Sequence, residues 1–339
     1  MKKIELANAV GTVLAHDLTE IIPGLSKGAR FKKGHVIKEE DLPILLNMGK
    51  RHLFVLEKGD DDIHEDEAAL RLARAASGSG IALTDPSEGK VELMAKVQGL
   101  LKIDKERLQK VTARNEIVLA TRHGDRMVKE GDKIAGARVI PLFVKPELIE
   151  EAEAICKNKP IIEIRPLQKL NVGVVTTGSE VYHGRIEDAF GPVLIRKFGA
   201  LGSTVVKQLF ADDDETMIAE KIRELIDDGV DMIGVTGGMS VDPDDMTPAG
   251  VKKAGGQIVT YGLPVMPGAM FLLAYIGDVP VVGLPGCVMY NRISIFDLIV
   301  PRLLAGEKPA PTELRQLAYG GLCLSCPTCS FPNCGFGLS

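Results

Sequence analysis

The chain has 339 residues, enough for two or three independent cores, and its 45% hydrophobic and 26% charged content is ordinary for a globular protein, which argues against intrinsic disorder. The formal net charge of −5 argues against a protein built mainly to hold nucleic acid, because phosphate binding needs a concentrated basic surface. One basic cluster makes only a small footprint of four charges, so we favour a solvated turn between short strands over a phosphate-binding patch; its members are Lys27, Arg30, Lys32 and Lys33.

The N-terminus lacks the apolar run of a secretory signal. No stretch of the sequence approaches the roughly 18 apolar residues that a membrane-spanning helix requires. We therefore expect a cytoplasmic protein that has neither a membrane nor a nucleic acid as its partner.

The first half of the chain is predicted to form two small domains. Residues 1–59 read as a β-rich module with a helix at 41–48 and a strand at 53–56. Residues 60–166 read as a helix followed by a small mixed β domain, which the chain leaves through a helix at 146–156.

From 167 to 308 the pattern changes to strands that alternate with helices, which is typical of βαβ units and a parallel sheet. Apolar residues that recur every three or four positions predict amphipathic helices, and a last helix at 288–304 would tolerate Pro301 or be kinked by it. We therefore predict an α/β domain with three layers around a parallel sheet. The predicted strands are 172–176, 204–208, 232–235, 271–275 and 279–283.

Segments rich in glycine and hydroxyl groups follow three of these strands. Ligands of open parallel sheets bind beyond the carboxyl ends of the strands, and such segments leave backbone N–H groups uncovered for a phosphate. A tight turn alone would explain any one of them, but three at one edge favour a binding site. Neither a dinucleotide fingerprint nor a P-loop is present. The candidate binding residues here are Thr177, Gly178, Ser179, Gly237, Gly238, Ser240, Pro285 and Gly286.

Aspartates gather at the same predicted edge. They follow the second strand at 212–214 and the third at Asp242, Asp244 and Asp245. Carboxylates that face phosphate-binding loops suit Mg²⁺ or an oxyanion. Helix capping is the alternative for one of the first group. For Asp245 the alternative is weaker, because Thr247 offers a competing cap.

These residues carry a family resemblance. Thr177-Gly178-Ser179-Glu180, Gly237-Gly238-Met239-Ser240 with Asp245, Pro267-Gly268 and Leu284-Pro285-Gly286 together resemble the molybdopterin-binding domain, over about Leu170 to Gly306. That domain is shared by molybdopterin adenylyltransferases, molybdopterin molybdenumtransferases and competence-damage-inducible proteins.

The resemblance implies roles for particular residues. The loops at Thr177, Gly237 and Leu284, with Pro267 and Gly268, would hold the pterin and phosphate of molybdopterin or adenylated molybdopterin. Asp245 and Asp213 would position Mg²⁺ or molybdate, and Glu180 would orient the dithiolene or the incoming oxyanion. A homo-oligomer is also implied.

Within the superfamily the motifs are mixed. The loop at Gly237 is similar to that of molybdenumtransferases, as is the N-terminal stretch 10–17, whereas Asp245-Met246-Thr247-Pro248 resembles adenylyltransferases, and 244–247 the competence-damage pattern. Cys287-Val288 stands where molybdenumtransferases carry Asn-Pro, and we expect no β-barrel domain after the last helix. Molybdate insertion is the first hypothesis and adenylyl transfer the second; a non-catalytic pterin-binding sensor and a nucleotide hydrolase remain as alternatives.

Four of the six cysteines lie in the C-terminal segment 309–339, here called the cysteine tail. Their spacing, C-x2-C-x2-C-x4-C, is similar to the bacterial ferredoxin run but has a longer last gap. We predict bound Zn²⁺ or an iron–sulfur cluster, with a reduced, flexible tail as the alternative. The ligands would be Cys323, Cys326, Cys329 and Cys334.

Overall fold

The computed structural model describes residues 2–22, 26–55, 62–240 and 245–338. The predicted boundary at residue 59, together with Asp242 and Asp244, lies outside these residues. In the part described, no helix is both long and apolar enough to cross a bilayer.

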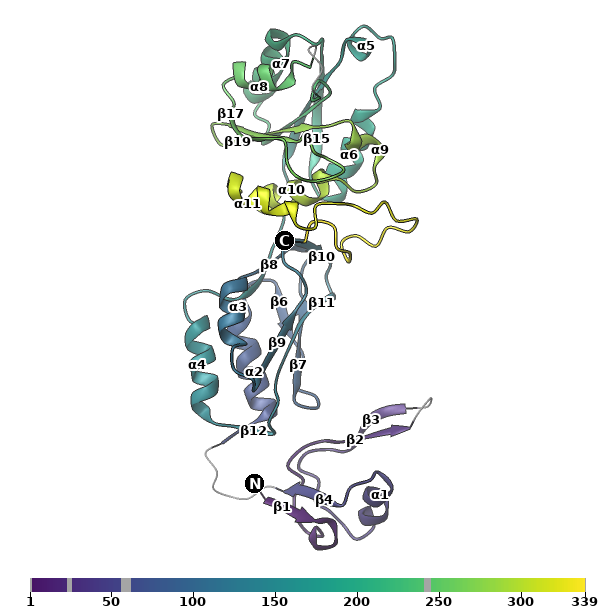
Figure 1. Ribbon diagram of the computed structural model, residues 1–339, viewed down its shortest axis with the longest axis vertical. Coiled ribbons are helices and arrows are strands. Elements are labelled where there is room, and N and C mark those ends of the chain that lie inside the picture. Colours follow the sequence, from purple (N-terminus) through teal and green to yellow (C-terminus); the bar gives the residue numbers. More distant parts are fainter. Residues whose placement is uncertain (1, 23–25, 56–61, 241–244, 339) are drawn as a thin grey trace. The chain divides into compact units, whose positions relative to one another are not determined.

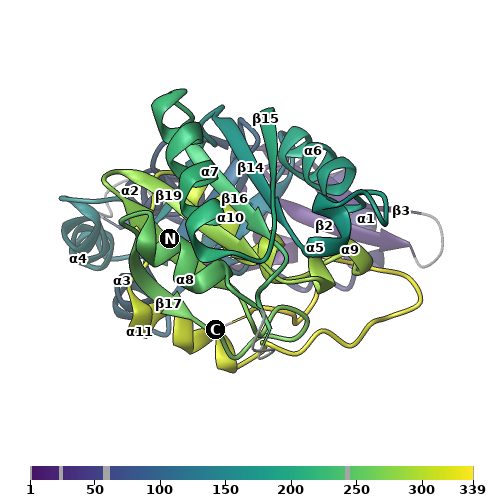
Figure 2. The same cartoon turned by 90° about the horizontal axis from the view of Figure 1, so that it is seen from above.

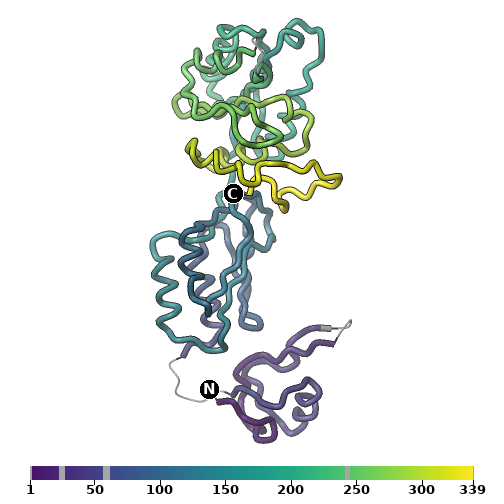
Figure 3. Tube along the Cα trace, in the orientation of Figure 1, coloured from purple at the N-terminus to yellow at the C-terminus, as the bar shows by residue number. Residues whose placement is uncertain are grey.

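Contacts divide the chain into two units, and two short segments leave the first unit to join the second (Figure 3). Unit 1 comprises Met1–Lys96, Ile103–Arg122 and Glu130–Glu163, and unit 2 comprises Val97–Lys102, His123–Lys129 and Ile164–Ser339.

The N-terminal part of unit 1 has two pairs of antiparallel strands and a buried cluster around Leu14, Leu45 and Leu53. Lys27 and Arg30 lie exposed on a strand, so the basic cluster is not confined to a turn as predicted. The elements are β1 (Lys2–Glu5), η1 (Leu6–Asn8), β2 (Leu18–Ile22), β3 (Ser26–Phe31), α1 (Asp41–Asn47) and β4 (His52–Val55).

The remainder of unit 1 is a sheet of order β6-β7-β11-β9, with α2 packed on β7 and β11 and α4 packed on α2. The helix predicted at 146–156 forms, with Pro146 in its first turn, where a missing N–H is tolerated. The elements are β5 (Ile63–His64), α2 (Glu65–Ala76), β6 (Ile81–Leu83), β7 (Lys90–Ala95), α3 (Lys105–Val111), β9 (Ile117–Thr121), β11 (Lys133–Val139), β12 (Phe143–Val144) and α4 (Pro146–Cys156).

The main sheet of unit 2 has the order β15-β14-β16-β19-β18-β17. Its central strands are buried along their length, as expected for parallel strands covered on both faces. The strands are β14 (Asn171–Thr177), β15 (Thr204–Ala211), β16 (Met232–Thr236), β17 (Gln257–Tyr261), β18 (Leu272–Ile276) and β19 (Val279–Leu284).

Helices cover both faces of this sheet, which confirms the predicted three-layer α/β fold (Figures 1 and 2). The apolar sides of α6 and α10 bury one face, and those of α7 and α8 bury the other. The helices of this domain are α5 (Ser179–Tyr182), α6 (Phe190–Ala200), α7 (Glu215–Asp227), α8 (Thr247–Lys253), α9 (Cys287–Tyr290) and α10 (Ile295–Leu304).

Two predictions about the sheet are wrong. The strand predicted at 271–275 runs antiparallel to β19, because only Gly277 and Asp278 separate the two strands, and a parallel pair would need a long crossover. The strand β17 was not predicted; it lies at the sheet edge and is mostly exposed, so its hydrophobic pattern is weak.

The helix predicted at 288–304 is also wrong in part, because it is two helices. The chain is extended at Asn291, and Ser294 starts α10 with a capping box closed by Asp297. Pro301 lies inside α10, so the interruption is not at the proline.

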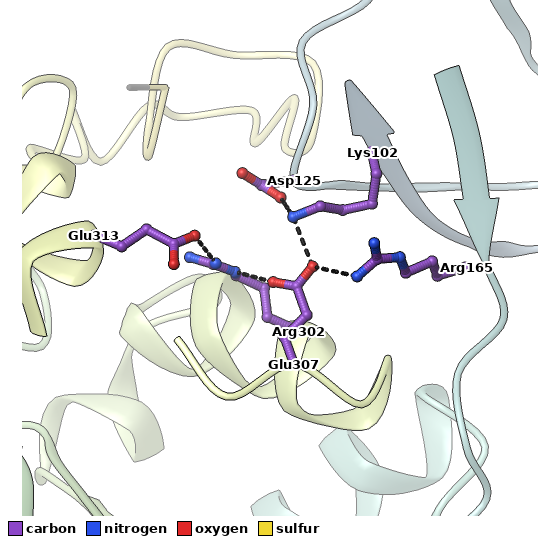
Figure 4. A network of polar contacts seen from close by, with 6 residues as sticks. All are labelled: Lys102, Asp125, Arg165, Arg302, Glu307 and Glu313. Atoms are coloured by element: carbon purple, nitrogen blue, oxygen red, sulfur yellow. Dashed lines mark hydrogen bonds and ion pairs between the residues drawn. The ribbon is translucent and has the colours of Figure 1, made fainter. Parts of the chain in front are cut away.

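A second, small sheet of order β10-β8-β13 lies beside α10, and a network of ion pairs joins them (Figure 4). The carboxylate of Glu307, whose side chain is 9% exposed, accepts from Arg302 at 2.8 Å, Lys102 at 2.6 Å and Arg165 at 3.2 Å. Arg302 also pairs with Glu313, at the start of the cysteine tail. The elements are β8 (Gly99–Ile103), β10 (Arg126–Val128), β13 (Ile162–Arg165), α11 (Pro311–Arg315) and η2 (Gln316–Ala318).

Candidate functional site at the carboxyl edge of the sheet

The predicted binding segments meet at one edge of the main sheet, here called the carboxyl edge. Four parallel strands end there, at Thr177, Ala211, Thr236 and Leu284. Because β18 runs the other way, its first residue pairs with Gly283, and the segment that precedes it reaches the same edge. The topology therefore brings all the loops with candidate residues together.

Threonine hydroxyl groups tie two of these loops to each other. The Thr177 hydroxyl donates to the carbonyl of Thr236 at 3.0 Å, and the Thr247 hydroxyl donates to the carbonyl of Gly237 at 2.9 Å. The two hydroxyl oxygens are 3.3 Å apart. Thr247 therefore connects loops and does not cap α8, whose N-cap is Met246 without a side-chain bond.

The glycines of the edge fall into two kinds. Gly237 has φ +86°, and a Cβ there would lie 2.3 Å from the carbonyl oxygen of Thr177, so packing alone requires glycine. Gly238, with φ +52°, is similarly crowded by Thr247. Gly286 differs, because its φ is −51° and no atom of the other described residues lies within 4 Å of a Cβ placed there. Neither strain nor crowding explains this glycine.

Carboxylates already bind two of the backbone N–H groups that were expected to be uncovered. The N–H of Ser179 donates to Asp213 at 2.9 Å, and the N–H of Ser240 donates to Asp245 at 2.6 Å. The expectation that these loops present uncovered N–H groups is therefore wrong at these two positions, since a ligand would have to replace an aspartate.

The acidic side chains at the edge influence one another. Burial is the largest cause that raises the pKa of Asp213, and the hydrogen bond from Ser179 opposes it. The nearby negative charges raise this pKa further; they belong to Asp212, Glu180 and Asp245. The edge is thus electrostatically suited to a cation.

The other two aspartates of the 212–214 segment have separate roles. Asp214 caps α7 by accepting from the N–H of Met217, as the capping alternative predicted. Asp212 accepts from the N–H of Asp213, which lowers the pKa of Asp212, and it lies 3.2 Å from Nε2 of His183. This leaves Asp213 as the member of the segment that faces the other carboxylates.

Pro267 and Gly268 pack against the start of α10. The carbonyl of Pro267 accepts from the N–H of Ile295 at 3.1 Å, and a Cβ at Gly268 would lie 2.4 Å from the Ile295 side chain. Gly268 is therefore required for close packing on α10, whatever else this segment binds.

Sequence reasoning missed two polar residues of the edge. Tyr261, at the end of the unpredicted strand β17, donates to the carbonyls of Met239 at 3.2 Å and Ser240 at 3.3 Å. Burial raises the pKa of Tyr261, and the charge of Asp245 adds to this. The hydroxyl of Thr236 is buried and has no partner among the described residues. Only the position of Thr236 at a strand end could have pointed to it.

No three His, Cys, Asp or Glu side chains in the described ranges converge closely enough to hold one metal ion. The aspartates alone therefore form no complete metal cage. The four thiols of the cysteine tail likewise do not converge on one point, and all are free.

Comparison with known proteins gives two family matches. Residues 173–305 match the model of a family described as a probable molybdopterin binding domain. Residues 3–57 match a family described as a domain of unknown function (DUF8806).

Individual relatives match parts of the chain. A CinA-like protein of Mycobacterium avium is 39% identical over 75 residues, which are 22% of this chain and 17% of the relative. A molybdopterin molybdenumtransferase of Synechococcus elongatus is 26% identical over 153 residues, 42% of this chain and 38% of the relative. The chain thus spans well under half the length of these curated relatives.

Among solved structures, the molybdopterin biosynthesis moea protein of Pyrococcus horikosii is similar with a TM-score of 0.33 and 14% identity, over 90% of this chain and 74% of that one.

Proposed function

We propose that this chain, whose residues 173–305 form a domain of the molybdopterin-binding superfamily, binds molybdopterin or its adenylate at the carboxyl edge and inserts molybdate during molybdenum cofactor biosynthesis. The proposal covers the substrate, the reaction and the roles of the edge residues.

The observation that carries the proposal is the contrast between rigid and open positions at the edge. Thr177 and Thr247 fix the two central loops through carbonyl groups, so the loops are organised without a ligand. At Gly286 there is open space, because no atom of the other described residues lies within 4 Å of a Cβ placed there. Preorganised loops beside such a space suit a ligand whose phosphate and pterin must be positioned accurately.

The aspartates act in this proposal by exchanging partners. Without ligand, Asp213 and Asp245 accept from the N–H groups of Ser179 and Ser240. Asp213 and Asp245 would hold a cation, and the N–H groups of Ser179 and Ser240 would then be available to phosphate oxygens. Glu180, exposed on α5, would orient the dithiolene or the incoming oxyanion.

The carboxylates fit Mg²⁺. This ion favours one or two carboxylates together with ligand phosphates over a cage made only of protein. Burial is the main cause that raises the pKa of Asp213, and the charges of Asp212, Glu180 and Asp245 add to it, so a cation there would relieve their repulsion. When bound, Mg²⁺ would neutralise phosphate and oxyanion charge at the reacting groups.

Molybdate insertion releases AMP from adenylated molybdopterin, and this release is the test. We expect the purified chain to release AMP with adenylated molybdopterin, molybdate and Mg²⁺, and Asp245→Asn to abolish it while the fold is retained. Asp278→Asn is the control, because Asp278 is an exposed carboxylate in the β18–β19 turn, away from the carboxyl edge. Absence of AMP release from the unaltered chain under every metal condition would refute the insertion activity.

A nucleotide hydrolase is the second candidate, and the similarity to CinA-like proteins favours it. The same edge would then hold a nucleotide diphosphate. Hydrolysis of ADP-ribose, without AMP release from adenylated molybdopterin, would support this candidate over the first.

A further inference from the structure

The cysteine tail has little regular structure but is held in place at defined points. The N–H of Met266 donates to the carbonyl of Gly321, and the N–H of Cys323 donates to the carbonyl of Met266, both at 2.8 Å. Near its end, the N–H of Gly337 donates to the carbonyl of Gly320 at 2.7 Å, which closes the tail into a loop. The yellow segment in Figure 1 follows this path beside α10 and β10. The tail in the structure therefore differs from the flexible tail of the alternative prediction.

All four cysteines of the tail line one cavity of about 560 Å³. Cys323 and Cys334 pack against the buried cluster around α10, Cys329 is half-buried and Cys326 is exposed. Phe331 and the buried Phe336 complete an apolar wall. The cavity is thus a partly open space lined by all four thiols.

A buried cation lies beside these two phenylalanines. Arg126 of β10 is only 4% exposed, and its guanidinium lies 5.1 Å from the centre of the Phe331 ring and donates to the carbonyl of Phe336. Its Nε and Nη1 have no hydrogen-bond partner in the described part of the chain. Burial lowers the pKa of Arg126, and the charges of Cys334 and Asp125 oppose this shift.

A buried charge is unfavourable unless negative groups compensate it, so a further negative centre beside this arginine would be stabilising. One thiolate, at Cys334, would supply part of that charge. A centre that joins all four thiolates would supply more.

We propose that Cys323, Cys326, Cys329 and Cys334 bind an iron–sulfur cluster in this cavity, with the charge of Arg126 balancing the net negative charge of the cluster. None of the candidate binding residues of the carboxyl edge lines this cavity, and the proposal stands whether or not the chain inserts molybdate.

The arrangement favours a cluster over a single zinc ion. Zinc requires its sulfurs at about 2.3 Å from one point. No three of the described Cys, His, Asp or Glu side chains converge in that way, although the four thiols surround one space. In a cluster the thiolates bind different iron atoms around a larger body, which needs such a space. A positive group near the sulfurs is also a known means of tuning such clusters.

The test is the metal content of the full chain, purified without oxygen and, in a second sample, reconstituted with ferrous iron and sulfide. We expect a brown protein with about two or four irons and an equal amount of acid-labile sulfide per chain, the ratio separating the two common cluster types. Stoichiometric zinc in a colourless protein, or no bound metal after reconstitution, would overturn the proposal.

Substitution of single cysteines identifies the ligands. We expect Cys326→Ser and Cys329→Ser each to lower the iron content at least about twofold, because one of the four thiolates is lost. Cys287→Ser is the matched control: it is a free cysteine of the same unit that is not among the residues lining the cavity, so its iron content should not change. Equal iron in all three variants would contradict the assignment. Circular dichroism of the metal-free proteins checks that each variant is folded.

Arg126→Gln tests the role of the buried charge. Loss of a positive charge disfavours adding an electron, so we expect the reduction potential of the cluster to fall while its iron-to-sulfide ratio stays the same. An unchanged potential would show that Arg126 does not balance the cluster.

Discussion

The carboxyl edge and the cysteine tail belong to the same unit but are organised in different ways. At the edge, parallel strands fix where each loop starts, and hydroxyl groups such as those of Thr177 and Thr247 tie the loops together. In the tail, a few backbone bonds hold an irregular loop around a cavity, and Nε and Nη1 of the nearby Arg126 have no hydrogen-bond partner among the described residues.

This difference shows two sources of order in one domain. The edge takes its shape from the sheet and needs a ligand only for function. The tail lies beside the buried charge of Arg126, which a bound cluster would balance more fully. Variants that separate these two sources test the comparison.

The largest effect is expected where the ion network joins α10 to the small sheet and to the start of the tail (Figure 4). Glu307→Gln removes the carboxylate that Arg302, Lys102 and Arg165 share, so we expect a loss of about 3–5 kcal/mol in the free energy of unfolding, as for other buried ion pairs broken on one side. Denaturant unfolding measures this loss. Lys308→Met, at an exposed pair with Asp278, should leave stability unchanged. Equal stability of both variants would show that the network does not hold these segments.

The next effect concerns the rigid part of the edge. Gly237→Ala places a methyl group against the carbonyl of Thr177 at a positive φ, so we expect a loss of at least about 1–3 kcal/mol from backbone strain. Thermal unfolding would reveal it. A fully stable variant would mean that the Gly237 loop is not fixed by its contact with β14.

A smaller effect is expected from the hydroxyl link. Thr247→Val removes the donor to Gly237, and we expect a loss of about 1 kcal/mol, typical of one hydrogen bond. Hydrogen exchange of the amides at 237–240 should become faster, while exchange in the cysteine tail should not. Faster exchange in both places would mean that the two regions are not independent.

The smallest effect concerns pH. The folded protein raises the pKa of Asp213, so its protonated form is favoured by folding. This contribution to stability is complete below the ordinary aspartate range and is lost as pH rises through the raised pKa. We expect Asp213→Asn to flatten this fall in the ligand-free protein, as measured by thermal unfolding between acidic and neutral pH. An unaltered pH profile would contradict the electrostatic account of the edge.

Much of the fold was predictable, because buried strands and amphipathic helices leave clear periodic patterns. The antiparallel direction of β18 was signalled by the Gly277-Asp278 turn, which is too short for a parallel crossover. The strand β17 could not be predicted, because an exposed edge strand has little hydrophobic signal. The helix break before Ser294 was signalled by its capping box, which was not recognised.

The candidate edge residues were predictable as a group but not in their bonding. Glycine and hydroxyl residues at strand ends are visible in sequence, whereas the bonds from Ser179 to Asp213 and from Ser240 to Asp245 depend on how loops from different strands meet. For the same reason the contact of Tyr261 with the Ser240 loop, across the sheet edge, could not be read from spacing.

The most direct test of the central claim is calorimetric titration of the chain with molybdopterin, comparing the unaltered protein with Gly286→Ala. This substitution fits the backbone and meets no neighbour, so stability should be retained. We predict saturable binding by the unaltered chain and binding at least about tenfold weaker by the variant, because the methyl group occupies the space of the ligand. Equal binding by both proteins, or none by the unaltered chain, would contradict a molybdopterin site at the carboxyl edge.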